Sequence, residues 1–359
     1  MKKDGGKILS LQALRALAFI AIFLSHSYNN LENFGIFGVS IFIILSGFCM
    51  MLAYEKRRVY TKLRHRISFS IKKIAKLYPL HLICIIAALF LFGFDGITTI
   101  RQLLFNIPLL QAWIPNATFS INAVAWYLSL SLFLYFMFPL IRKWIKKEKD
   151  RKNLIWIAVA IYILQTWLSY AFSLTYFSDM KWITYCWPIF RLGDFTIGCI
   201  VGHLYGTRKA KQKAIKYQTF KYTLIELATL IAILGLEYLI LREVRPFSDD
   251  WRRYNVIYTP ISVLTVYLFT IKAGLLTRLL TNKVTIYLGN ISGYAFLIHK
   301  LLLNFIAPNI FPFLSNMPYA FRIVSAFILT IAFSVVYISA DTAIRKKIAN
   351  KKMVRVKRL

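Results

Sequence analysis

Acidic residues are scarce in this chain of 359 residues: 14 Asp and Glu stand against 46 Lys and Arg, which gives a formal net charge of +32. A surplus of this size can indicate a nucleic-acid partner. Here, however, the basic residues gather in clusters between long apolar segments, a spacing typical of the cytoplasmic loops of membrane proteins. The sequence therefore predicts contact with membrane lipids and no nucleic-acid partner.

Several motifs of soluble enzymes and metal proteins are also missing. The four cysteines form no CxxC or Cys/His spacing, so neither a disulfide framework nor a metal site is expected. There is no Gly-rich phosphate loop, no GxSxG or HExxH motif and no visible internal repeat. No cleavable signal peptide is evident, because the first apolar segment is too long and no small-residue cleavage site follows it. The evidence for function must come from the apolar segments themselves.

Hydrophobic residues make up 58% of the chain, too many for a soluble domain of this size. Ten segments approach the roughly 20 residues that a helix needs to cross the hydrocarbon core of a bilayer. They are 8–28, 34–54, 77–94, 122–141, 153–174, 187–206, 222–241, 254–271, 284–303 and 319–341. We predict an all-α, polytopic integral membrane protein of about ten transmembrane helices over residues 1–345. A basic cytoplasmic tail, 346–359, follows, and no fused soluble domain is expected.

The connections between these segments alternate in charge. The N-terminal residues 1–7, every second connection after them and the tail from residue 345 together hold 36 Lys and Arg, whereas the intervening connections hold 6. Because Lys and Arg accumulate in cytoplasmic loops, the alternation predicts that both termini lie in the cytoplasm. The expected location is the plasma membrane, crossed many times.

The first apolar segment carries two ionisable side chains, Arg15 and His26. Eleven residues of α-helix return to nearly the same face, about 20° past three full turns and about 16 Å further along. One stripe therefore presents a guanidinium in the inner half of the membrane and an imidazole near its outer end. Ionisable groups at membrane depth usually face a bundle interior and mark function. The structural alternative is that Arg15 snorkels to the headgroups and His26 lies at the outer interface.

The second span contains several small residues, including Ser46 and Gly47, and close packing against the first helix is the simplest interpretation. The basic segment after it, 56–76, fits three interpretations: an ordinary cytoplasmic loop, an amphipathic helix on anionic headgroups, or a landing site for a phosphate-rich cytosolic ligand. Its charge does not separate these.

Later spans contain four further candidates. Trp126 begins the fourth span, where tryptophan usually anchors a helix at the membrane interface. In the sixth span Arg191 and Asp194 stand three residues apart, close enough for a structural ion pair. His299 falls in the outer half of the ninth span, at a depth like that of His26.

Six blocks of the sequence resemble, in the same order, motifs of the acyltransferase 3 family of membrane proteins, which O-acylate surface glycans and related acceptors. The first helix matches the family's LxxLRxLA…H pattern, with Arg15 and His26 at its arginine-to-histidine spacing. The other blocks are GVSIFIILSGFCM, IAKLYPL, WYLSLSLFLYFMFPL, FRLGDFTIG and LGNISGYAFLIH. Two positions differ from the pattern. Ser131 replaces a common acidic residue five positions after Trp126, and Lys76 replaces an arginine before the Tyr-Pro pair.

The resemblance implies a membrane O-acyltransferase, with acetyl as the default acyl group and succinyl as an alternative. The donor would be a cytosolic acyl-coenzyme A, such as acetyl-coenzyme A, acting as a co-substrate rather than a permanently bound cofactor. The acceptor would be a hydroxyl of a surface polysaccharide or lipid-linked glycan. A transporter or flippase for a lipid-linked glycan or small solute is the alternative interpretation.

Within the enzyme interpretation, His26 would act as general base or carry the acyl group transiently. Arg15 would orient the donor or stabilise charge on the thioester oxygen, and His299 is a second candidate base. The candidates for donor binding are Lys72, Lys73, Lys76 and Tyr78. The family-motif positions without an assigned role are Ser46, Gly47, Trp126, Arg191 and Asp194.

Overall fold

The computed structural model describes residues 8–93, 96–175, 179–207, 218–306 and 317–356. Within these ranges the secondary structure is entirely helical, which confirms the predicted all-α class. The α-helices are α1 (Leu9–Ser27), α2 (Glu32–Ala53), α3 (Leu63–Ile74), α4 (Tyr78–Phe92), α5 (Gly96–Asn106), α6 (Trp126–Lys147), α7 (Arg151–Ser173), α8 (Pro188–Gly206), α10 (Thr219–Leu241), α11 (Asp250–Arg253), α12 (Thr259–Ile271), α13 (Leu275–Leu280), α14 (Lys283–Ile306) and α16 (Tyr319–Val356). Helices α4, α8 and α12 have proline in their first two positions, where its missing N–H leaves no helical hydrogen bond unmade.

Seven helices in the described ranges are long and apolar enough to cross a membrane: α1, α2, α6, α7, α10, α14 and α16. The pair α3 and α4, bent by 60° at a short break, would make an eighth as a broken span. The other two predicted spans are helical but weaker candidates. Helix α12 has 13 residues, and α8 includes the charged Arg191 and Asp194. The structure thus supports a polytopic membrane protein with seven or eight candidate spans, and the count of ten stays a prediction.

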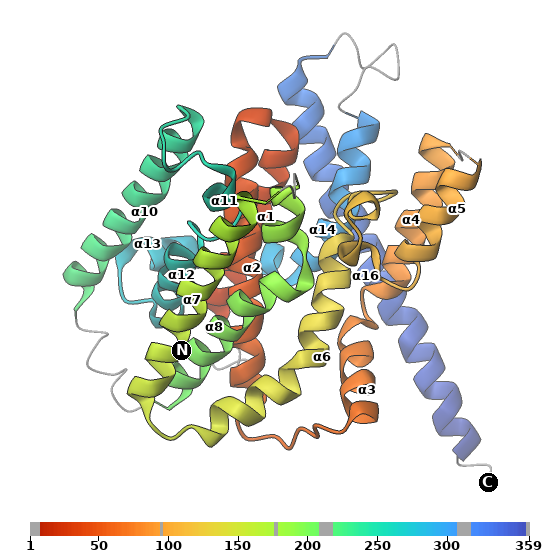
Figure 1. Ribbon diagram of the computed structural model, residues 1–359. Helices are drawn as coiled ribbons and strands as arrows, with labels where there is room; N and C mark the ends of the chain where they lie inside the picture. Colours follow the sequence, from red (N-terminus) through yellow and green to blue (C-terminus); the bar gives the residue numbers. More distant parts are fainter. Residues whose placement is uncertain (1–7, 94–95, 176–178, 208–217, 307–316, 357–359) are drawn as a thin grey trace.

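Helices α1 and α2 lie at the centre of the bundle, with α10 on one flank and α4 and α5 on the other (Figure 1). Small residues of α2 pack against two neighbours. A Cβ at Gly38 would lie 2.7 Å from the carbonyl oxygen of Ala18 in α1, whereas a Cβ at Gly47 would overlap the carbonyl oxygen of Phe195 in α8. Close packing of α2 against the first helix is confirmed, and α8 is a second close neighbour that was not predicted.

Helix α14 packs equally closely on α1. A Cβ at Gly289 would overlap the carbonyl oxygen of Gln12, so the two backbones touch near the start of both helices. Near their ends His299 meets His26. Because residue numbers rise together along the contact, the two helices run in the same direction. This parallel packing places two membrane-depth histidines side by side.

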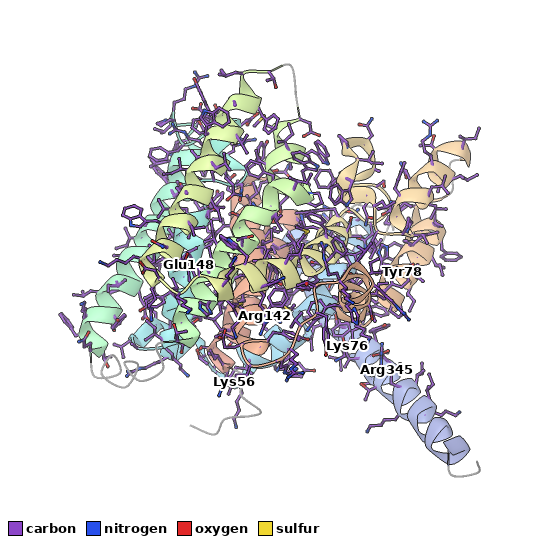
Figure 2. The ribbon with its side chains drawn as sticks, turned by 60° about the horizontal axis from the view of Figure 1, so that its bottom comes forward. Lys56, Lys76, Tyr78, Arg142, Glu148 and Arg345 are labelled. Atoms are coloured by element: carbon purple, nitrogen blue, oxygen red, sulfur yellow. The ribbon has the colours of Figure 1, made fainter. Side chains whose placement is uncertain are left out.

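Basic side chains from separate predicted cytoplasmic segments lie at one end of the bundle. Figure 2 labels Lys56, Lys76, Arg142 and Arg345 at this lower end, beyond which α16 projects. Hydrogen bonds join the segments, since the Arg142 guanidinium donates to the Arg57 carbonyl at 2.8 Å. The charge alternation along the sequence thus corresponds to a basic end of the folded protein.

Candidate active site

His26 and His299 form a hydrogen-bonded pair between α1 and α14. Nδ1 of His26 lies 2.8 Å from Nε2 of His299, and the rings stack with centroids 5.1 Å apart. The other nitrogen of His299, Nδ1, lies 2.7 Å from the carbonyl oxygen of Phe296. Since a carbonyl only accepts, His299 Nδ1 holds the proton, and in a neutral pair its Nε2 accepts from Nδ1 of His26. His26 Nε2 is then unprotonated and can take a proton.

His26 lines a cavity of about 370 Å³, called here the imidazole cavity. Its polar lining consists of Ser25, Asn29, Glu32, Lys181 and Lys300. Its aromatic lining consists of Phe119, Trp126, Tyr185 and Phe296. Aromatic faces combined with a few polar groups are typical of small-molecule sites. His26 therefore belongs to a wall that can hold a polar organic ligand.

Trp126 is part of this wall and not an interface anchor, so that prediction was wrong. The side chain is 3% exposed, and its ring packs on Tyr185 with centroids 4.9 Å apart. The start of α6 is covered by the preceding segment, where the Gln111 amide donates to the Ala125 carbonyl at 3.0 Å. A tryptophan at the end of a span lies at the interface only when no other segment covers it.

His299 is fully buried at 0% exposure and does not line the cavity. Its ring meets Phe19 edge-on, with centroids 5.8 Å apart, and both of its nitrogens are hydrogen-bonded. This placement suits a residue that holds the His26 ring and selects its tautomer.

Arg15 lines a different cavity of about 150 Å³, called here the guanidinium cavity. No carboxylate in the described ranges forms an ion pair with its guanidinium. The polar lining consists of Ser46, Lys73, Tyr127, Ser131, Tyr135 and Ser292. Ser131, at the position of the family acid, thus faces the same space as Arg15. With hydroxyls in place of a carboxylate, the positive charge is available to an anionic ligand.

One of the four predicted donor-binding residues lines the guanidinium cavity. Lys73 does so from α3, with its ammonium 4.5 Å from the centroid of the Tyr54 ring. The residues outside the cavity wall are Lys72, Lys76 and Tyr78. The two lysines are exposed, and the tyrosine hydroxyl donates to a main-chain carbonyl at 3.0 Å. Lys73 therefore shares a cavity with Arg15, whereas the other three predicted donor-binding residues lie outside this cavity.

Arg191 and Asp194 form the expected ion pair, 3.1 Å apart and both at 0% exposure. Arg191 also donates to Asn255 and to Ser40, and Asp194 accepts from Thr259 at 2.9 Å. This network links α8 to α2 and α12, and neither charged residue lines the two cavities. The structural interpretation of the pair is confirmed.

Three charged residues of the imidazole cavity were not identified as site residues from the sequence: Glu32, Lys181 and Lys300. Lys300 directly follows His299 inside an apolar span, and this position is a usable signal. Glu32 and Lys181 lie in connections 149 residues apart and form an ion pair beside the imidazole cavity. No local pattern predicts that such distant residues meet.

A family model described as an acyltransferase domain matches residues 8–339, so the chain belongs to the acyltransferase 3 family. It is also similar to the acyltransferase MdmB of Streptomyces mycarofaciens, with 30% identity over 178 residues. That match covers 43% of this chain and 44% of the relative, so less than half of the relative's length is aligned. No solved structure matches the chain. The family membership supports the enzyme interpretation over the transporter or flippase.

Proposed function

We propose that this protein is an O-acyltransferase of the plasma membrane. It moves an acyl group, acetyl in the simplest case, from cytosolic acyl-coenzyme A to a hydroxyl of a surface polysaccharide or lipid-linked glycan. The main supporting observation is the state of His26, whose Nδ1 is held 2.8 Å from His299 while Nε2 keeps its lone pair. A positioned, unprotonated imidazole in a cavity wall is what general-base catalysis requires.

In the proposed reaction, the acceptor hydroxyl lies in the imidazole cavity. His26 Nε2 takes the hydroxyl proton as the oxygen attacks the thioester carbonyl carbon. The carbon–sulfur bond then breaks, and the coenzyme A thiolate leaves and takes the proton from His26. The base returns to its starting state, and its help is worth about 10²–10⁴-fold in rate.

The donor is proposed to enter from the basic end of the bundle, which faces the cytosol if both termini are cytoplasmic. Lys73 lies in α3 at this end, and Arg15 lies in the same guanidinium cavity. The Lys73 ammonium attracts the phosphates of coenzyme A. Arg15, deeper in the bundle, is placed to stabilise the charge that develops on the thioester oxygen.

The acceptor is proposed to carry an acidic group. Lys300 lines the imidazole cavity, and no described residue forms a hydrogen bond or ion pair with its ammonium. Lys181, in contrast, is paired with Glu32. A partly buried ammonium without a partner among the described residues favours a ligand that supplies an anion, such as the carboxylate or phosphate of an acidic glycan.

The direct test uses the full chain in lipid nanodiscs with radiolabelled acetyl-coenzyme A and cell-wall glycan extracts as acceptor. Wild-type protein is expected to release coenzyme A thiol and to label the glycan. His26→Ala should fall to near background with an unchanged melting temperature. The control is His203→Gln, since His203 lies near Glu55 and outside both cavities. Full turnover by well-folded His26→Ala would refute the mechanism.

The same preparation separates the two possible roles of His26. In the absence of acceptor, a transient acyl-histidine would leave label on rapidly denatured wild-type protein and none on His26→Ala. A general base leaves both proteins unlabelled. Mass spectrometry of the surface polysaccharide, from cells with and without this chain, identifies the acceptor.

A further inference from the structure

The imidazole and guanidinium cavities lie end to end along the same helices. On α2, Val39 lines the imidazole cavity, and Phe42, one turn later, lines the guanidinium cavity. On α14, Lys300 lines the first and Ser292 the second. Phe296, between them on α14, lines both. The two spaces are therefore neighbours separated by a thin layer of side chains.

Three aromatic rings from three helices form this layer: Phe42 of α2, Tyr127 of α6 and Phe296 of α14. The Phe296 centroid lies 5.3 Å from that of Tyr127 and 6.2 Å from that of Phe42. Phe42 and Tyr127 are 6.1 Å apart, so each ring contacts the other two. Tilted and edge-to-face contacts of this kind stabilise aromatic pairs by about 0.5–1.5 kcal/mol each. The ring trio is thus a packed partition.

The partition is joined to the catalytic pair through the main chain. The Phe296 carbonyl accepts from His299, which in turn holds His26. The Phe296 side chain is 6% exposed and also packs against the His299 ring, with centroids 5.7 Å apart. Any group that reaches His26 from the guanidinium cavity must pass beside this ring.

We infer that the ring trio is the acyl-binding site and that it restricts the donor to short, uncharged acyl groups, with acetyl preferred. This inference rests on the proposed function. With the coenzyme A phosphates toward Lys73 and the base at His26, the thioester lies between the two cavities. Its acyl group then lies against Phe42, Tyr127 and Phe296.

The packing of the trio provides the size limit. Each added methylene must displace a ring that contacts two others, and overpacking of well-packed interiors costs about 1–3 kcal/mol. A succinyl group would also bring a carboxylate against aromatic faces, which carry negative charge density, and two of the three rings, Phe42 and Phe296, offer no hydrogen-bond donor. The trio therefore disfavours both long and anionic acyl groups.

The experiment compares acetyl-, butyryl-, hexanoyl- and succinyl-coenzyme A by coenzyme A thiol release, with the full chain in nanodiscs. The variants are Phe42→Ala and Phe296→Ala, with Phe42→Leu and Phe296→Leu as milder replacements that keep a packed core. The matched control is Phe48→Leu. Phe48 lies on the same helix as Phe42 and is fully buried against Tyr205, but lines neither cavity.

For wild type we expect kcat/KM to fall at least tenfold from acetyl to butyryl and further for hexanoyl, with succinyl near background. One methylene in a pocket is commonly worth about 10-fold or more in discrimination. The Phe42 and Phe296 variants should raise the ratio of kcat/KM for butyryl- to that for acetyl-coenzyme A at least tenfold. Phe48→Leu should keep the wild-type ratio.

An unchanged ratio in folded, active Phe42 and Phe296 variants overturns the inference and leaves the proposed function intact. The same holds for a wild type that uses hexanoyl- or succinyl-coenzyme A as well as acetyl. If all folded trio variants lose every activity, the rings do more than set size, and the inference is also wrong. If folded wild type turns over none of the donors, the proposed function fails with it.

Discussion

Arg15 and His26 lie on one face of α1, about 16 Å apart along its axis, yet they line two different cavities. Phe296 contributes to the wall of both. A donor held at Arg15 and an acceptor held at His26 would therefore meet at this ring. In the proposed reaction, this separation would keep a cytosolic acyl donor and an acceptor from the other side apart until the acyl group is transferred.

The role of His299 can be tested by two replacements that differ in chemistry. In His299→Gln, a side-chain oxygen can still accept from Nδ1 of His26, whereas His299→Phe fits the aromatic surroundings of Phe19 and Phe296 but accepts nothing. We expect kcat to fall roughly 10-fold for His299→Gln and roughly 10²-fold or more for His299→Phe, with little change in KM. Steady-state kinetics and melting curves check this. If His299→Phe proves the more active variant, His299 has a packing role.

Substitutions at two adjacent lysines, Lys73 and Lys72, should affect the binding of the acyl donor differently. Lys73 lines the guanidinium cavity with Arg15, and Lys72 is exposed and outside it. We expect Lys73→Met to raise the KM for acetyl-coenzyme A about tenfold, equivalent to about 1.4 kcal/mol, and more at low salt than at high salt. Lys72→Met is the control and should behave like wild type. Equal effects of the two substitutions would show that only the general basic surface matters.

Helix packing predicts opposite effects of alanine at two glycines. A Cβ at Gly47 would overlap the Phe195 carbonyl of α8, so Gly47→Ala forces two helices apart and should cost about 1–3 kcal/mol or more. No atom of the described residues lies within 4 Å of a Cβ at Gly235 in α10, where alanine should gain up to about 1 kcal/mol of helix propensity. Thermal unfolding in detergent measures both. A Gly47→Ala protein as stable as wild type would contradict the close approach of α2 and α8.

The Arg191–Asp194 pair predicts strongly non-additive stability effects. Arg191→Met or Asp194→Leu alone leaves a buried charge without its partner and should destabilise by about 3–5 kcal/mol. The double substitution removes both charges and should cost less than the sum of the single ones. A double-mutant cycle by chemical unfolding gives the coupling. Additive effects would show that the two side chains do not interact in the membrane.

The predicted orientation can be tested by thiol labelling of intact cells. In a variant without its natural cysteines, Asn30→Cys in the first connection should react with a membrane-impermeant reagent, and Lys147→Cys at the basic end should not. Both positions are exposed, so access by solvent is not the limiting factor. Labelling at position 147 in sealed cells would reverse the orientation and the proposed direction of acyl transfer.

Local patterns in the sequence were sufficient to predict where the helices lie and to select some of the candidate site residues. Hydrophobic segments indicate where helices lie, because each span must satisfy its own backbone hydrogen bonds and bury apolar side chains within one segment. The ion pair of Arg191 and Asp194 could also be predicted locally, because residues three positions apart lie on one turn of the same helix. The selection of Arg15 and His26 also needed only the helical repeat and the cost of charge in a membrane.

Features that depend on contacts between distant segments could be found only in the tertiary structure. The His26–His299 hydrogen bond joins residues 273 positions apart, and it depends on where Gly289 allows α14 to approach α1. The burial of Trp126 depends on a preceding segment that covers the start of α6. Hydropathy and spacing describe one helix at a time, whereas a cavity is the space left between several helices. The amino-acid sequence therefore determined which side chains this protein places at membrane depth, and only the packing of the helices decided which of them meet.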